Sequence, residues 1–357
     1  MDQHISREDP ATAKPGINAR HIGRLKAASI LLTAAGIGLF VYFIYTTGVD
    51  ELIDGIVRFG WTGFAVVAGL FFLRILVRAG AWNLSVYEPY RLGYRDTVPA
   101  VIIGEAMSSL IPLGILISGT AKAVAVRQRV PLVSGLSSVA TENLFYSLVT
   151  SIFLILGAVI FARGFELDPG WVWAIDVIIV GIVAVVVFLV VMVIRQWHFA
   201  SELCEKLYRR GIARGWLENG RLDVRLFENM IYGFYRRYPR RFLPICGFEA
   251  AYHIIGIAEV WYVLYRLGDA FPSLLNSFLL ESVSRLVTIM FKLIPFVIGV
   301  DEAGAQFVGD TVGLAAGVAV TLALIRKGRI LFWTAIGILF IVKRGLRLPS
   351  LAGRAEA

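Results

Sequence analysis

Charged residues are scarce in this chain of 357 residues: they make up 17% of it, whereas hydrophobic residues make up 57%. A soluble globular protein carries about 25% charged residues, because its surface helices need a polar face. So few polar side chains could not cover a soluble core of this size. The composition therefore excludes a soluble enzyme, a nucleic-acid-binding domain and a disordered regulator, and it predicts an all-α polytopic membrane protein.

Cysteine, histidine and recognisable catalytic motifs are also few. The two cysteines, Cys204 and Cys246, lie in a basic and an apolar stretch, so we expect no disulfide framework and no zinc site. The four histidines do not cluster, and the chain has no HExxH, G-x-S-x-G or P-loop motif. We therefore expect no enzyme activity, no cofactor and no metal. Active transport would then need an ion gradient or a partner protein.

The N-terminal part of the chain predicts a membrane anchor. Residues 1–26 are polar and end in a basic group, and the next 23 residues, 27–49, contain no charge. The apolar core of a cleaved signal peptide has about 7–15 residues, so this run is better explained as a first transmembrane helix. Lys and Arg gather on the cytoplasmic side of membrane proteins. We therefore expect a cytoplasmic N-terminus in the cytoplasmic (inner) membrane, and we attribute the net charge of +9 to topology.

Further apolar runs predict a helix bundle of about eight spans within residues 27–345, followed by a cytoplasmic tail at 346–357. The later runs cover residues 59–87, 98–118, 131–162, 171–194, 242–267, 273–300, 303–325 and 330–342. The last run has only 13 residues, short for a spanning helix of about 20, and the basic cluster 326–329 divides it from the run before. Arg74 and Arg78 share one helix face. We expect them to extend to the cytoplasmic headgroups, with contact to a lipid phosphate as the alternative.

Residues 195–241 form the longest polar stretch, with eleven Lys and Arg against five Asp and Glu. This excess predicts a cytoplasmic position. Leucines at helical spacing, such as Leu203 and Leu207, favour two amphipathic helices on the anionic inner leaflet.

Two apolar runs contain helix-breaking residues. Residues 98–118 have basic flanks on both sides and Pro112 and Gly114 within them, which predicts a re-entrant hairpin beside a cavity. An ordinary kinked helix is the alternative. The tripeptide Leu110-Ile111-Pro112 recurs as Leu293-Ile294-Pro295, with Gly299 soon after. Paired interruptions of this kind in the two halves of a chain indicate a duplication around a transporter's binding site.

Several ionisable residues lie within apolar runs, where each costs about 2.5–3.5 kcal/mol at the centre of a membrane helix. Glu281, Arg285, Thr288 and Lys292 follow one helix face, so this face must avoid lipid. One interpretation is a slot in which Arg285 and Lys292 bind a headgroup phosphate. The other is an ion-pair network with acids of other helices that only holds the bundle together. We expect His253 to be a hydrogen-bonded interhelical group.

Two stretches carry a resemblance to a known family. Residues 104–148 contain Ile111-Pro112-Leu113-Gly114, Ser118-Gly119-Thr120-Ala121-Lys122 and Glu142-Asn143, and residues 295–303 contain Pro295 and Gly299-Val300-Asp301-Glu302-Ala303. With these motifs, about residues 20–345 resemble the flippase-like transmembrane domain of lysylphosphatidylglycerol synthases and its stand-alone relatives, including hopanoid-associated membrane proteins. Asn143 stands where the family pattern has arginine, and Ser118-Gly119-Thr120 lacks its double glycine and acid. The synthases carry a further soluble domain after the membrane domain, so we do not expect this chain to make lysylphosphatidylglycerol.

The resemblance implies a lipid flippase or lipid transporter that moves a polar-headgroup lipid between leaflets through a central polar cavity. The implied partner is a membrane lipid, either an anionic phospholipid or an isoprenoid-type lipid. A secondary transporter of a small anionic solute and a non-transporting membrane scaffold are the alternatives; a cavity open toward lipid favours the first function, and a sealed one favours the solute. The residues expected to bind the headgroup or gate the cavity are Glu105, Pro112, Gly114, Lys122, Glu142, Asn143, Glu281, Arg285, Lys292, Pro295, Gly299 and Glu302.

Overall fold

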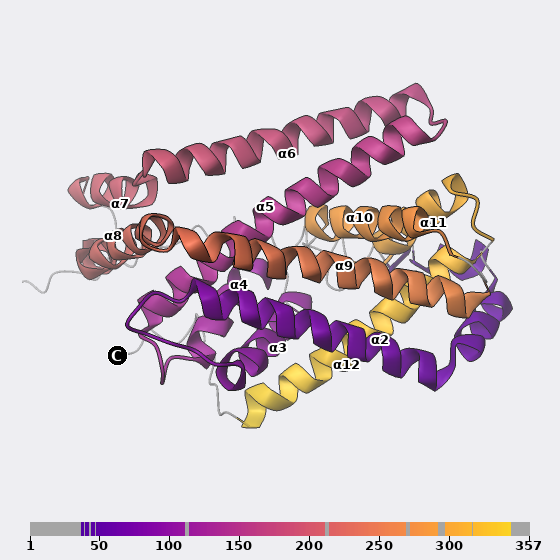
Figure 1. Cartoon of the computed structure of the whole chain (residues 1–357), viewed down its shortest axis with the longest axis horizontal. Coiled ribbons are helices and arrows are strands. Elements are labelled where there is room, and N and C mark those ends of the chain that lie inside the picture. Colours follow the sequence, from indigo (N-terminus) through magenta and orange to yellow (C-terminus); the bar gives the residue numbers. More distant parts are fainter. Residues whose placement is uncertain are drawn as a thin grey trace, which may run out of the picture.

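The computed structural model describes residues 37–38, 40–42, 44–46, 48–110, 114–210, 214–268, 272–291, 297–315 and 317–343. The side chains of residues 51, 114–116 and 214–221 also lie outside the description. Helices and their connections make up all of the described ranges, which contain no strand (Figure 1). The prediction of an all-α protein is therefore confirmed. The expected tails and most of the first expected span, 27–49, lie outside the described residues.

The helices follow one another in a single bundle. Their bounds are α2 (Val49–Ser85), α3 (Tyr94–Leu110), α4 (Gly114–Ala125), α5 (Leu132–Gly164), α6 (Pro169–Arg195), α7 (Phe199–Arg209), α8 (Arg214–Arg237), the 3-10 turn η1 (Pro239–Arg241), α9 (Phe242–Leu267), α10 (Leu274–Met290), α11 (Val300–Thr311) and α12 (Val318–Lys343). Within the described ranges, four segments are long and apolar enough to cross a membrane: Leu52–Ser85, Leu132–Gly164, Pro169–Arg195 and Pro239–Leu267. The chain thus has helices of the transmembrane type, while the expected total of about eight spans stays a prediction.

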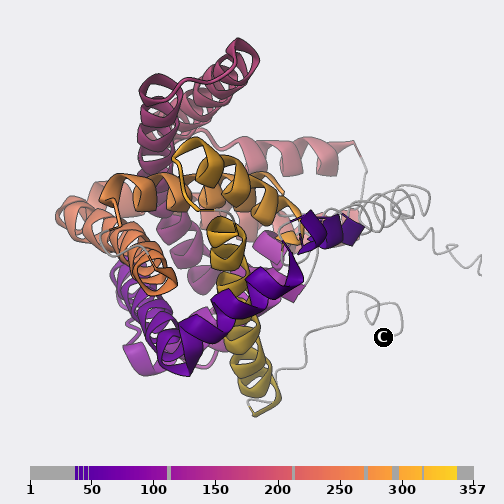
Figure 2. The ribbon, with the colours of Figure 1, turned by 90° about the vertical axis from the view of Figure 1, so that its right-hand side faces the viewer.

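The apolar core lies where α2, α9, α10 and α12 meet. Val67 of α2, Leu264 of α9, Leu279 of α10 and Leu322 of α12 pack in one cluster and are almost fully buried. Helix α6 differs from these helices, because none of its residues is buried. It packs on α5 and stands away from the remaining bundle (Figures 1 and 2). Side chains this apolar and this exposed are suited to a lipid environment.

Both expected helix interruptions coincide with helix ends. Helix α3 ends at Leu110 and α4 begins at Gly114, and the two helices pack against each other. Helix α10 ends at Met290 and α11 begins at Val300, and these also pack together. The residues between the helices, 111–113 and 292–296, lie largely outside the described ranges. Each expected interruption thus falls between two described helices that pack together, and re-entry from one side of the membrane stays a prediction.

The basic cluster at residues 326–329 does not separate two helices, and this part of the sequence analysis is wrong. Helix α12 runs without interruption through Arg326, Lys327 and Arg329, whose side chains are buried. The expected run 303–325 is instead divided between α11 and α12. Charge interrupts a hydropathy pattern, but it does not interrupt a helix when acids on neighbouring helices pair with it.

Two further expectations are corrected by the N-terminal half. The expected span 59–87 belongs to the longer helix α2, which bends at Gly60, where φ is 66° and ψ is 175°. A positive φ is open to glycine at little cost. Arg74 and Arg78 of this helix do not extend to headgroups, because they are 1% and 7% exposed and pair with acids inside the bundle.

The polar stretch 195–241 contains two helices, α7 and α8, as the leucine spacing predicts. They pack against each other, and α8 also packs on α5 (Figure 1). Leu203, Leu222 and Leu226 remain exposed on them. An exposed apolar face on a basic helix is typical of helices that lie on an anionic membrane surface.

Candidate functional site

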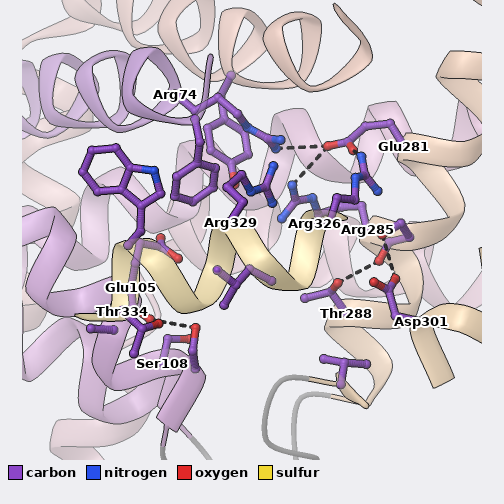
Figure 3. A pocket seen from close by; sticks show the side chains of 18 residues that line it. Arg74, Glu105, Ser108, Glu281, Arg285, Thr288, Asp301, Arg326, Arg329 and Thr334 are labelled. Atoms are coloured by element: carbon purple, nitrogen blue, oxygen red, sulfur yellow. Dashed lines mark hydrogen bonds and ion pairs between the residues drawn. The ribbon is translucent and has the colours of Figure 1, made fainter. Parts of the chain in front are cut away.

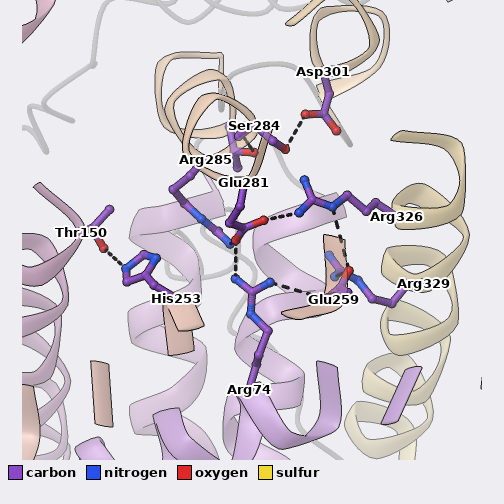
Figure 4. A network of polar contacts seen from close by, with 11 residues as sticks. Arg74, Thr150, His253, Glu259, Glu281, Ser284, Arg285, Asp301, Arg326 and Arg329 are labelled. Atoms are coloured by element: carbon purple, nitrogen blue, oxygen red, sulfur yellow. Dashed lines mark hydrogen bonds and ion pairs between the residues drawn. The ribbon is translucent and has the colours of Figure 1, made fainter. Parts of the chain in front are cut away.

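An ion-pair network joins α2, α9, α10 and α12 inside the bundle (Figure 4). Glu281 of α10, 1% exposed, lies at its centre. Its Oε1 accepts hydrogen bonds from Arg74 Nη2 at 3.0 Å and from Arg285 Nη2 at 3.1 Å. Its Oε2 accepts a hydrogen bond from Arg326. One carboxylate therefore holds guanidinium groups from three helices.

Glu259 of α9 is the second acid of this network and is fully buried. Its Oε2 lies 3.6 Å from Arg74 Nη1, and its Oε1 lies 3.9 Å from Arg326 Nε. Arg329 donates a hydrogen bond to the same Oε1. Arg74 and Arg326 thus contact both glutamates, so the two acids and their arginines form one unit.

The network carries more positive than negative charge. Four arginines face two glutamates, which leaves a formal excess of two positive charges within the group. Aromatic rings contribute part of the compensation: the guanidinium carbons of Arg74 and Arg285 lie 4.1 and 5.2 Å from the ring centre of Tyr252, and that of Arg329 lies 4.3 Å from the ring of Phe71. Cation–π contacts of this kind are worth about 2 kcal/mol when desolvated. The remaining positive charge suits an anionic ligand.

A second polar centre joins α2, α3, α4 and α5. Arg78 donates to Glu142 Oε1 from Nη2 at 2.6 Å and from Nε at 3.0 Å. Lys122 Nζ lies 3.9 Å from Glu142 Oε2, and Arg78 Nη1 lies 3.9 Å from Glu105 Oε1. Glu142 is buried, whereas a third of the Glu105 side chain is exposed. Glu105 therefore connects this centre with the adjoining cavities.

The first turn of α11 forms a third polar group. Glu302 accepts a hydrogen bond from the backbone N–H of Gly299 at 2.8 Å, which caps its own helix. Lys327 of α12 lies 2.9 Å from Glu302 and 3.8 Å from Asp301. Ser284 of α10 donates to Asp301 at 2.8 Å. These contacts fasten α11 to both neighbouring helices.

A small polar cavity of about 130 Å³ adjoins the arginines (Figure 3). Cavities of this size take a few water molecules or one small anion. The labelled side chains around it are polar and come from α2, α3, α10, α11 and α12: Arg74, Glu105, Ser108, Glu281, Arg285, Thr288, Asp301, Arg326, Arg329 and Thr334.

A larger, partly open cavity of about 570 Å³ lies beside the first. Its polar lining includes Arg78, Lys122, Asn143 and Arg285. Its apolar lining includes five residues of α6: Ile178, Gly181, Ile182, Val185 and Leu189. Both cavities are lined by Glu105, Ser108, Tyr252, Arg285 and Thr288, so the two cavities are neighbours that share these side chains.

The structure brings many of the predicted site residues together. Glu105 and Arg285 line both cavities, Glu281 lines the smaller one, and Lys122 and Asn143 line the larger one. Glu142 lies buried behind Arg78 and Lys122, Gly299 and Glu302 cap α11, and Gly114 is the first residue of α4. Pro112, Lys292 and Pro295 lie outside the described residues. The expected ion-pair network is present among the described residues and adjoins the smaller cavity, whereas the headgroup slot stays a prediction.

Five cations of these centres were not predicted as site residues from the sequence: Arg74, Arg78, Arg326, Lys327 and Arg329. A signal for them exists, since Arg326 and Arg329 are three residues apart within a long apolar stretch and so share a face. The buried acids Glu259 and Glu281 also needed cations from other helices. His253, in contrast, makes an interhelical hydrogen bond as expected, with Nε2 2.9 Å from Thr150 Oγ1 (Figure 4), while its Nδ1 has no partner among the described residues.

The described residues offer no site for a metal, because none of their His, Cys, Asp and Glu side chains gather in groups of three or more suited to one. A protein-family model described as the lysylphosphatidylglycerol synthase TM region matches residues 27–337, which is most of the chain. No curated protein and no solved structure matches the sequence.

Proposed function

Since the chain belongs to the family of the lysylphosphatidylglycerol synthase TM region, we propose that it moves a polar-headgroup lipid between the leaflets of the cytoplasmic membrane. In this proposal the N-terminus and the basic helices α7 and α8 face the cytoplasm, and the chain performs no chemical step. The observation that carries the proposal is the composition of the larger cavity.

The two ends of this cavity match the two ends of a lipid. Arg78, Lys122 and Arg285 supply cations for a headgroup phosphate at one end. The α6 side chains supply an apolar wall for acyl or isoprenoid chains at the other end. Because the headgroup would be paired inside the bundle while the chains stay against apolar surface, the lipid need not expose its charge to hydrocarbon.

The partly open form of the cavity favours a lipid over a small solute. A solute site is expected to be closed off from lipid, whereas α6 contributes a thin, single-helix wall whose outer face is exposed. The smaller polar cavity keeps the second candidate, a transporter of a small anion, in consideration, because it has the size and the arginines for one. The transfer experiment described next distinguishes the lipid transporter from the anion transporter.

Gly181 offers a test that leaves the polar centres untouched. It lines the larger cavity, and a Cβ built on it meets nothing within 4 Å, so the position has room for a side chain and Gly181→Trp adds bulk to the cavity lining. Proteoliposomes containing fluorescent phosphatidylglycerol are treated with dithionite, which quenches outer-leaflet label. We expect Gly181→Trp to slow transfer at least about tenfold, which corresponds to about 1.4 kcal/mol in the barrier.

Val180→Trp is the matched control, because it adds the same side chain at the neighbouring, exposed position outside the cavity lining. It should transfer lipid at the wild-type rate. Equal rates for both variants would contradict a lipid path along α6. Absence of lipid transfer together with uptake of radiolabelled phosphate by the wild type would favour the solute transporter, and absence of both would favour a scaffold.

A further inference from the structure

Glu249 of α9 is a buried acid that the proposed headgroup site does not use. It is fully buried, and neither of its carboxyl oxygens has a hydrogen-bond partner among the described residues. Glu142 Oε2 is likewise buried and accepts no hydrogen bond from the described part of the chain, although Lys122 Nζ lies 3.9 Å away. A charged group without a partner is costly to bury. A hydrogen-bond donor is therefore needed beside the carboxyl groups of Glu142 and Glu249.

The groups around Glu249 come from three other helices. Glu142 of α5, Arg78 of α2 and Lys122 of α4 act most strongly on its carboxyl, and Cys246 precedes it by three residues on its own helix. With Glu105, which pairs with Arg78, the centre holds three carboxyl groups and two cations. If all are ionised, the buried Glu142 and Glu249 balance Arg78 and Lys122, and the partly exposed Glu105 adds a third negative charge beside them.

One bound proton supplies a hydrogen bond between the two carboxyl groups. Two ionised carboxylates have no hydrogen to donate to each other. A proton bound to Glu249 supplies an O–H donor for Glu142 Oε2, and the centre then has two negative and two positive charges. Shared protons between neighbouring carboxyl groups are a known outcome of like charges in one site.

We propose that Glu142 and Glu249 share a single proton, and that the protein carries this proton together with its lipid. The inference rests on the proposed function. On uptake, a hydronium ion gives up a proton and an O–H bond forms at Glu249. On release, that O–H bond breaks and a water molecule accepts the proton, so two carboxylates remain beside Arg78 and Lys122.

The coupling follows from the position of the two cations. Arg78 and Lys122 line the larger cavity on one side and contact Glu142 on the other. An anionic headgroup bound to them offsets their charge, so the carboxyl pair then holds its proton more firmly. By reciprocity the bound proton strengthens headgroup binding by the same factor. A proton gradient would thus supply the energy for transfer.

The transport experiment uses the fluorescent phosphatidylglycerol assay with a pH gradient across the proteoliposome and the membrane potential clamped. We expect the wild-type transfer rate to change at least about fivefold when the gradient is reversed, the lower end of typical coupling between sites. Glu249→Gln keeps the size of the side chain but cannot bind or release a proton, so its rate should not depend on the gradient. Asp310→Asn, which removes an exposed acid of α11, should behave as the wild type.

A second measurement detects the proton without transport. The infrared spectrum of the purified protein at neutral pH should contain the carbonyl stretch of a protonated carboxylic acid. The band should be absent in Glu249→Gln, retained in Asp310→Asn and shifted in Glu142→Gln, which changes its hydrogen-bond partner. The comparison of this band between the wild type and Glu142→Gln remains informative even if Glu249→Gln does not fold.

The outcomes separate the two proposals. Lipid transfer that ignores the gradient, with no carboxylic-acid band in the wild type, would overturn the shared proton and leave lipid transfer standing. A band with no transfer of any lipid would overturn the coupling and the proposed function together, while the proton site itself would remain. Gradient-dependent transfer that is unchanged in a folded Glu249→Gln would assign the proton to another group and reject the inference.

Discussion

Glu281 illustrates how charged residues persist inside an apolar bundle. Its carboxylate contacts Arg74, Arg285 and Arg326, so no member of the group is buried without a partner of opposite charge. Pairs of this kind need not add net stability over apolar side chains, but the loss of one member leaves the others uncompensated. The arginines are therefore held in position by acids and remain available on the cavity side.

We predict that Glu281→Gln destabilises the protein by about 3–5 kcal/mol, because three guanidinium groups inside the bundle lose their shared counter-charge. The free energy of unfolding is measured by circular dichroism in mixed detergent micelles of increasing SDS content. Asp310→Asn is the control, since its carboxylate is exposed and should change that free energy by less than about 0.5 kcal/mol. Equal stability of the two variants would mean that the network does not hold the bundle.

Helix α12 decides how the C-terminal third of the bundle is built. It packs against α3, α11 and α2 and carries Arg326, Lys327 and Arg329 into the interior. Its crossing with α3 is close at Gly337, where an added Cβ would lie 2.5 Å from Ala106 Cβ and 3.0 Å from the backbone oxygen of Ile102. The first distance is shorter than real Cβ contacts, so the two helices depend on glycine here.

We therefore predict that Gly337→Ala destabilises the protein by about 1–3 kcal/mol, because α3 and α12 must move apart. Gly328→Ala is the matched control on the same helix, since its Cβ would meet Phe64 at an ordinary 3.4 Å. Alanine favours a helix by about 1 kcal/mol over glycine, so Gly328→Ala should be neutral or stabilising. The melting temperatures of both variants in detergent check this, and a stable Gly337→Ala would contradict the close crossing.

The whole molecule places its polar centres on one side of a cavity and its most apolar helix on the other. Arg285 lies where the two cavities meet, with its side chain mostly buried and paired with Glu281. Helix α6 closes the larger cavity from the lipid side. This arrangement, rather than any single residue, connects the buried cations with the surrounding membrane.

We predict that one class of phosphate-bearing lipid is enriched over the bulk membrane when the wild-type protein is purified gently and analysed by native mass spectrometry. Arg285→Gln should lose that enrichment, because it removes the cation common to both cavities. Arg163→Gln is the control, since Arg163 is exposed and pairs with Asp176 away from the cavities. A lipid profile equal to the bulk membrane in all three proteins would weigh against lipid binding in the cavity.

The helices themselves follow from the sequence, because a bilayer leaves few structures open to long apolar runs. The interruptions near Pro112 and Pro295 and the amphipathic helices α7 and α8 are readable for the same local reasons. The continuity of α12 could not be predicted in this way, because a hydropathy pattern counts Arg326, Lys327 and Arg329 as a break. Local pattern cannot distinguish a charge that meets water from one that meets an acid of another helix.

By itself, the sequence determined that this is an α-helical membrane protein of its family, with ionisable residues that must avoid lipid. Only the tertiary structure decided which acid meets which cation: Glu281 with arginines of α2, α10 and α12, and Glu142 with Arg78 and Lys122. It also decided that neither carboxyl oxygen of Glu249 has a hydrogen-bond partner among the described residues. The physical reason is that pairing energies depend on distances between helices far apart in the chain, which helical periodicity does not contain.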